Sequence, residues 1–189
     1  MRLSPQTARR YGWVPNALTV GRLVALPLII WMLAYDGGPT SAMAAWTFGA
    51  VAVTDFIDGR LARALNAEST FGRIADPFAD RMLVAVGLIG LIAIGRMGPV
   101  GPLIILVRDI VLMLGVVAMR NSGIDVRVDM FGKVSSFLVM AAVGLALLST
   151  ARWIDVLFWI AVVLSVASFL HYVRTALLAL RGRGISTQS

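Results

Sequence analysis

Long apolar stretches alternate along the chain with short polar or glycine- and proline-containing segments. The apolar stretches recur with about the 20-residue length that a bilayer-crossing helix needs. We expect six helices, over residues 16–35, 41–63, 71–95, 103–120, 131–149 and 153–180. Pro15 favours the start of the first helix, and the segments 36–39 and 98–102 favour turns. The pattern therefore predicts an all-α, polytopic membrane protein with six transmembrane helices.

The two ends of the chain are more polar than these stretches. Residues 1–13 carry three arginines beside Tyr11 and Trp13, and no signal-peptide cleavage site precedes the first apolar run. This composition predicts a short amphipathic segment at the membrane surface, with a disordered tail as the alternative. Residues 181–189 are predicted to form a disordered tail. Without a repeat or a low-complexity linker, residues 1–189 are expected to form a single membrane domain.

Composition supports the membrane interpretation and narrows the chemistry. The chain is 59% hydrophobic and only 14% charged, and its mean hydropathy is +0.85. It contains no cysteine, which excludes disulfides and thiolate chemistry. The net charge of +7 comes mostly from arginines beside the apolar segments, which favours anionic lipid over nucleic acid as the partner.

The distribution of lysine and arginine predicts the orientation. The N-terminus, the connections after the second and fourth helices, and the C-terminus carry eleven of these residues, whereas the alternate connections carry only Arg96 and Arg152. By the positive-inside rule both termini are then cytoplasmic. We expect an integral plasma-membrane protein whose active site faces the cytoplasm, at the ends of the second and third helices.

An acidic cluster marks those helix ends. Four of the ten acidic residues fall between positions 55 and 80, namely Asp55, Asp58, Asp76 and Asp80. The first two share a helical face with the small residues Gly59 and Ala62, at spacings i, i+3, i+4 and i+7, and the last two stand at i and i+4. Carboxylates near a bilayer are costly, so cations between them are the simplest explanation.

Hard divalent cations take oxygen ligands, and two ions bridged by carboxylates can clamp a pyrophosphate. We expect two Mg²⁺ or Mn²⁺ ions, with one carboxylate free to take a proton from an attacking hydroxyl. Three alternatives stay open: aspartates that cap helices and pair with nearby arginines, a prenyltransferase that binds a diphosphate, and a membrane transporter that binds a cation.

The full spacing is Asp55-x2-Asp58-Gly59-x2-Ala62-Arg63-x8-Gly72-x3-Asp76-x3-Asp80, eight fixed residues over 26 positions. This spacing resembles the motif of the CDP-alcohol phosphotransferase family. The resemblance implies transfer of a phosphatidyl group from CDP-diacylglycerol to an alcohol with release of CMP, and suggests a homodimer. It also implies that Asp55, Asp58 and Asp76 hold the two metals, while Asp80 shares in the site and acts as the base. Gly59, Ala62 and Gly72 would make room for the cytidine nucleotide, and Arg63 would meet its phosphate.

Two further groups of residues are candidates for substrate binding. Asn16, Thr19 and Arg22 open the first helix in an arrangement similar to the glycerol-acceptor branches of the family, where this region lines the nucleotide site. Asn16 and Thr19 are therefore candidates for nucleotide binding. Arg22 is a candidate for acceptor binding, or could instead anchor the helix at the interface. Arg108 and Lys133 could bind the phosphate of an acceptor while Asp109 orients a neighbour. Alternatively, Arg108 and Asp109 simply neutralise each other. The single histidine, His171, is expected to pack rather than to act in catalysis.

The acceptor is inferred from the fourth and fifth helices. Phosphatidylglycerophosphate synthases of the family tend to show Arg-Glu in the fourth helix and Gly-Lys-x-Lys-Thr in the fifth. This chain has Arg108-Asp109 in the fourth helix. In the fifth helix, its run from Gly132 to Phe137 lacks the second lysine. It is more similar to the cardiolipin synthases, which implies phosphatidylglycerol as the acceptor. A phosphatidylglycerophosphate synthase that uses glycerol 3-phosphate is the alternative.

Overall fold

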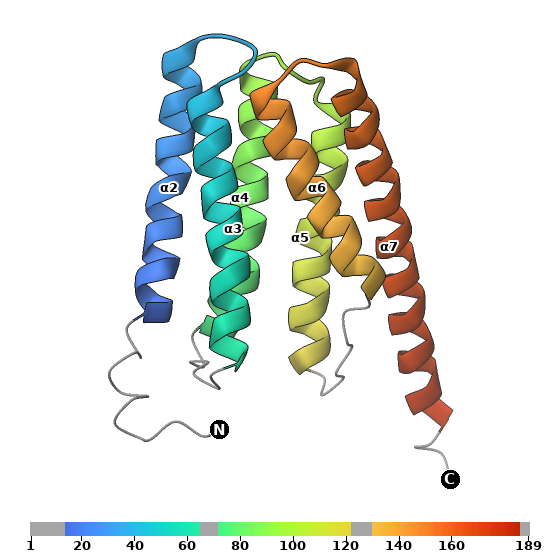
Figure 1. Ribbon diagram of the computed structural model, residues 1–189. Coiled ribbons are helices and arrows are strands. Elements are labelled where there is room, and N and C mark those ends of the chain that lie inside the picture. Colours follow the sequence, from blue (N-terminus) through green and yellow to red (C-terminus); the bar gives the residue numbers. More distant parts are fainter. Residues whose placement is uncertain (1–13, 65–71, 122–129, 186–189) are drawn as a thin grey trace. The chain divides into compact units, whose positions relative to one another are not determined.

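The computed structural model describes residues 14–64, 72–121 and 130–185. Within these ranges the chain forms six helices and no strand, so the predicted all-α class and the predicted order of helices are confirmed (Figure 1). The helices are α2 (Val14–Asp36), α3 (Ala42–Ala64), α4 (Gly72–Ala93), α5 (Val100–Asn121), α6 (Met130–Leu148) and α7 (Arg152–Ile185).

Two predicted boundaries were wrong. Helix α5 begins at Val100 rather than at residue 103, and the Leu103 N–H donates to the Pro99 carbonyl at 2.9 Å. Pro102 is tolerated there because the first N–H groups of a helix have no intrahelical partner. Helix α7 continues to Ile185, so residues 181–185 are helical rather than disordered; basic side chains at 181 and 183 favour the C-terminal end of a helix. The predicted N-terminal segment, residues 1–13, and the last four residues lie outside the described ranges.

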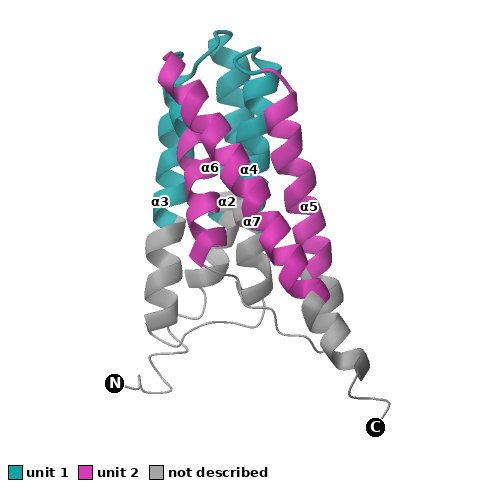
Figure 2. Cartoon of the chain, turned by 90° about the vertical axis from the view of Figure 1, so that its right-hand side faces the viewer, with its two compact units in different colours: residues 1–97, 143–150 teal, residues 98–142, 151–189 magenta. Residues whose placement is uncertain are grey.

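The chain divides into two compact units (Figure 2). Unit 1 comprises residues 1–97 and 143–150, and therefore contains α2, α3, α4 and the last residues of α6. Unit 2 comprises residues 98–142 and 151–189, and contains α5, the larger part of α6, and α7.

Close helix packing forms the core of unit 1. Helix α2 packs against both α3 and α4, and α3 also contacts α4. At Gly87 of α4 the approach is so close that an added Cβ would lie 2.5 Å from Cγ1 of Val143 and 3.0 Å from Cε2 of Phe48. Both neighbours are almost completely buried. Small residues allow helix backbones to approach each other in this way, as is typical of membrane helices.

Polar contacts fix the connection between α2 and α3. Ser41 precedes α3 as its N-cap: its hydroxyl accepts a hydrogen bond from the Ala44 N–H at 3.1 Å and donates one to the carboxylate of Asp36. The Ser41 N–H donates to the Leu147 carbonyl at 2.9 Å, which ties this connection to the end of α6 in the same unit. Gly37 has a φ of 60°, a conformation that glycine adopts without steric cost.

In unit 2, α5 packs against α7. The contact includes Gly101, where an added Cβ would lie 2.6 Å from Cε1 of Phe158. The buried side of α5 continues through Ile105 and Arg108, and that of α7 through Ala161 and Ser165. The charged side chain of Arg108 thus stands within a buried face of α5 that is otherwise apolar.

Two helices are long and apolar enough to cross a membrane by length and composition: α6, Met130–Leu148, and α7 within Arg152–Leu177. Shorter apolar stretches occupy parts of α2, α3 and α4. Large apolar side chains are exposed on several helices, including Val107, Phe137 and Val163, as expected for a protein surrounded by lipid. These features make a membrane protein plausible, and the six crossings stay a prediction.

Candidate active site

Both halves of the acidic motif lie on helices. Helix α3 carries the residues from Asp55 to Arg63, and α4 begins at Gly72 and carries Asp76 and Asp80. The predicted i, i+3, i+4 and i+7 relation on α3 and the i, i+4 relation on α4 therefore apply to real helices. The side chains of all these residues lie outside the described part of the structure, so their roles as metal and nucleotide ligands stay predictions.

The helices that carry the predicted metal and nucleotide residues belong to one unit. Asn16, Thr19 and Arg22 lie on α2, which contacts both of the helices that carry the motif. The side chains of these three residues are likewise outside the described part. Every residue predicted to bind the metals or the nucleotide therefore lies on one of three helices of unit 1 that contact each other.

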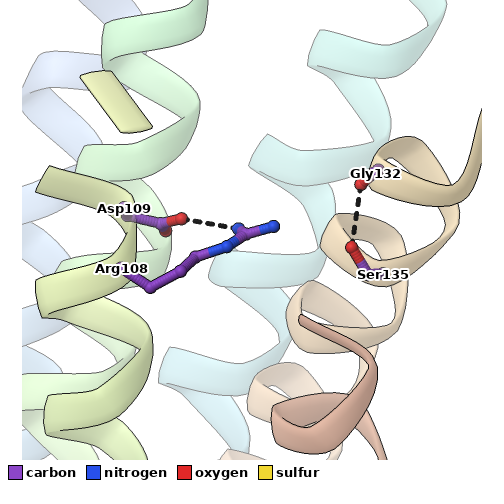
Figure 3. A network of polar contacts seen from close by, with 4 residues as sticks. All are labelled: Arg108, Asp109, Gly132 and Ser135. Carbon is purple, nitrogen blue, oxygen red and sulfur yellow. Dashed lines mark hydrogen bonds and ion pairs between the residues drawn. The ribbon is translucent and has the colours of Figure 1, made fainter. Parts of the chain in front are cut away.

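In unit 2, Arg108 and Asp109 form the ion pair that the neutralising alternative anticipated. Nη1 of Arg108 donates to Oδ1 of Asp109 at 2.7 Å, and the two side chains are only 8% and 16% exposed (Figure 3). Adjacent residues of a helix do not face each other, so the ion pair forms because the arginine side chain is long enough to reach the carboxylate of Asp109. Burial makes such a contact strong, since little water screens it.

The pair does not use the whole guanidinium. Nε of Arg108 is buried and has no hydrogen-bond partner in the described part of the chain. In Figure 3 the guanidinium extends from α5 toward the first turns of α6, at the level of Gly132 and Ser135. Ser135 is buried, and its hydroxyl donates to the Gly132 carbonyl at 3.0 Å. Lys133, between them, is exposed.

The donor set of the motif fits a divalent cation. Four carboxylates offer the oxygen ligands that hard cations such as Mg²⁺ and Mn²⁺ prefer. Among the side chains that the structure describes, no group of three or more histidines or acidic residues could hold a metal. The four motif aspartates lie outside that search.

Comparison with known proteins establishes the class. The family model for CDP-alcohol phosphatidyltransferase matches residues 12–167, which include the whole acidic motif and α5. The chain belongs to the CDP-alcohol phosphatidyltransferase family. It is therefore a membrane-associated transferase of phospholipid biosynthesis, and enzymes of this family generally use divalent metal ions.

Named relatives divide between two activities. The chain is 33% identical over 181 residues to a cardiolipin synthase (CMP-forming) from Streptomyces coelicolor, covering 85% of this chain and 84% of the relative. It is 33% identical over 178 residues to a probable phosphatidylglycerophosphate synthase from Mycobacterium tuberculosis, with coverages of 89% and 83%. It is also 30% identical over 168 residues to a CDP-diacylglycerol–glycerol-3-phosphate 3-phosphatidyltransferase from Rickettsia bellii, with coverages of 84% and 92%.

Proposed function

We propose that the chain is a cardiolipin synthase, which transfers the phosphatidyl group of CDP-diacylglycerol to a glycerol hydroxyl of phosphatidylglycerol. The observation that carries this choice is the sequence of α5 and α6, where Arg108-Asp109 is followed by Gly132-Lys133 without a second lysine. The similarity to the Streptomyces coelicolor cardiolipin synthase over most of both chains supports it.

In the proposed reaction the acceptor oxygen attacks the phosphorus that bears the diacylglycerol. Asp80 takes the hydroxyl proton, a new phosphorus–oxygen bond forms, and the bond to the CMP phosphate breaks, so CMP leaves. Asp55, Asp58 and Asp76, with Asp80, would hold the metals. Divalent ions at this position would neutralise charge on the pyrophosphate and polarise the phosphorus.

The nucleotide half of the donor is assigned to unit 1. Gly59, Ala62 and Gly72 leave room for the cytidine, and Arg63 binds a phosphate of the nucleotide. Asn16 and Thr19 line the same nucleotide site from α2, and this assignment is supported by the contacts of α2 with α3 and α4.

Acceptor binding is assigned chiefly to unit 2. Arg108 carries a charge into a buried setting, and its unpartnered Nε leaves one donor for a phosphate oxygen. Asp109 fixes the direction of the guanidinium through the 2.7 Å contact. Lys133 is exposed near the start of α6. Arg22, on α2, is proposed as an acceptor-binding residue from the sequence pattern alone.

The proposal also includes the setting of the enzyme. The eleven-to-two distribution of lysine and arginine supports a plasma-membrane protein with both termini and the active site on the cytoplasmic side. A homodimer is proposed from the family resemblance alone.

Phosphatidylglycerophosphate synthesis is the second candidate, because relatives with that name match the chain at similar identity. An acceptor comparison separates the two. The purified protein in detergent with Mg²⁺ and CDP-diacylglycerol is given phosphatidylglycerol or glycerol 3-phosphate, and CMP release is followed. We expect release with phosphatidylglycerol. Release with glycerol 3-phosphate alone would keep the chemistry and overturn the choice of acceptor.

A further inference from the structure

Two buried polar atoms of unit 2 lack a hydrogen-bond partner in the described part of the chain: Nε of Arg108 on α5 and Oγ of Ser165 on α7. Ser165 is 1% exposed and Arg108 is 7% exposed. A buried polar group without a partner is costly, and most such groups in folded proteins are satisfied. Both atoms are therefore candidates to bind a group that is not part of the polypeptide.

The helix register places these two residues level with each other. Helices α5 and α7 run in the same direction (Figure 1), and Gly101 of α5 meets Phe158 of α7. Arg108 and Ser165 each follow these contact residues by seven positions. Seven residues are almost two helical turns, so each returns to the face that made the first contact, about 10 Å further along.

Burial agrees with that register. On α5 the buried face continues from Gly101 through Ile105 to Arg108, and on α7 it continues from Phe158 to Ser165. Both polar residues therefore stand on the sides that the two helices turn toward each other. Nε of Arg108 and Oγ of Ser165 are not hydrogen-bonded to one another, since neither atom has a partner in the described part of the chain. A third atom between them would satisfy both.

The chemistry of the two groups defines that atom. Nε of arginine is a donor only, and the serine hydroxyl can donate as well, so an oxygen that accepts both bonds fits. The contact with Asp109 occupies Nη1 and leaves the Nε side of the guanidinium for this oxygen. A phosphate oxygen is the ligand for which arginine is best suited.

We propose that Ser165 is a further acceptor-binding residue, whose hydroxyl binds the same phosphate oxygen of the acceptor as Nε of Arg108. This inference rests on the proposed function, because it assigns the phosphate to the acceptor. The phosphate is a diester in phosphatidylglycerol and a monoester in glycerol 3-phosphate, and the same pair of donors would bind either.

The test is Ser165→Ala in the full-length protein in detergent, with Ser135→Ala as its matched control. Both substitutions remove a hydroxyl that is about 1% exposed, but that of Ser135 already donates to the Gly132 carbonyl. Because Ser135 lies level with Arg108 in Figure 3, the control also reports any general loosening of this region.

Steady-state CMP release gives KM for each substrate. Ser165→Ala should raise the KM for the acceptor about tenfold, the effect of one hydrogen bond between charged and neutral groups, and leave the KM for CDP-diacylglycerol unchanged. Ser135→Ala should leave both values unchanged. The thermal midpoint of Ser165→Ala without acceptor should not fall, and the rise that phosphatidylglycerol or glycerol 3-phosphate produces in the wild type should shrink.

A lowered midpoint with an unchanged acceptor KM would overturn the inference, because it would show that Oγ serves the fold, for instance through a bound water. The test of Ser165 can fail or succeed independently of the proposed choice of acceptor. If the wild type uses only glycerol 3-phosphate, the choice of phosphatidylglycerol fails, but the effect of Ser165→Ala on the glycerol 3-phosphate KM still decides the role of Ser165.

Discussion

Gly87→Ala tests the close packing that holds α4, and with it Asp76 and Asp80, in place within unit 1. The added Cβ would lie 2.5 Å from Cγ1 of Val143, whereas carbon atoms in contact are ordinarily about 3.5–4.0 Å apart. The shortfall is about 1 Å. Val143 cannot easily move away, because it is fully buried and its branched side chain has one favoured rotamer in a helix.

Overpacking of this kind lowers the free energy of unfolding by about 1–3 kcal/mol, whereas replacing a helical glycine by alanine raises it by about 1 kcal/mol. Gly49→Ala on α3 is the matched control, since nothing lies within 4 Å of its added Cβ and only the favourable effect applies. The two variants should therefore differ in unfolding free energy by about 2 kcal/mol, or about 4–8 °C in thermal midpoint.

Thermal unfolding of both variants in the same detergent measures this difference. We expect Gly87→Ala to unfold at the lower temperature and Gly49→Ala at or above the wild-type midpoint. Equal midpoints for the two variants would refute the packing of α4 against Phe48 and Val143. A loss of CMP release in Gly87→Ala at temperatures where it stays folded would further indicate that this contact positions the motif on α4.

Three other predictions concern a charge pair, a helix cap and the metals. Asp109→Ala leaves the Arg108 guanidinium buried without its partner and should lower the unfolding free energy by about 3–5 kcal/mol. Adding Arg108→Met to this variant should restore most of the lost stability but not the binding of the acceptor. A thermal midpoint of Asp109→Ala equal to that of the wild type would contradict this prediction. Ser41→Ala removes the N-cap of α3 and should lower stability by about 1 kcal/mol in chemical or thermal unfolding, and no change would mean that the hydrogen bond to Ala44 adds nothing. EDTA should abolish CMP release, and excess Mg²⁺ or Mn²⁺ should restore it; a rate that persists in EDTA would argue against the metal site.

Much of the fold follows from the sequence because apolar stretches and glycine-proline segments alternate so regularly. All six helices were predicted in order, and the errors lie at ends where local rules compete. The glycine-proline pattern predicts a turn at Pro102, although proline is acceptable in the first turn of a helix, where the structure places it. The polar composition near the C-terminus predicts a disordered tail, although the two arginines there favour the end of a helix, and α7 extends through both.

The contacts between helices could not be predicted in the same way. Gly87 carries no signal in the sequence that distinguishes it from Gly49, because the difference depends on which side chains of other helices lie opposite. Ser165 is equally inconspicuous: serines are common in apolar helices, and only the three-dimensional structure shows that its hydroxyl is buried without a partner. The acidic motif is the opposite case, since its spacing identifies the family without any knowledge of packing.

The central claim is that Asp80 activates the acceptor hydroxyl in a CMP-releasing phosphatidyl transfer. The most direct test is CMP release from CDP-diacylglycerol and phosphatidylglycerol by Asp80→Asn, compared with Asp155→Asn in the first turn of α7. Asparagine keeps the size of the side chain but cannot take the proton. We expect Asp80→Asn to fold with a normal thermal midpoint and to lose turnover, while Asp155→Asn stays active. Substantial turnover by folded Asp80→Asn would contradict it.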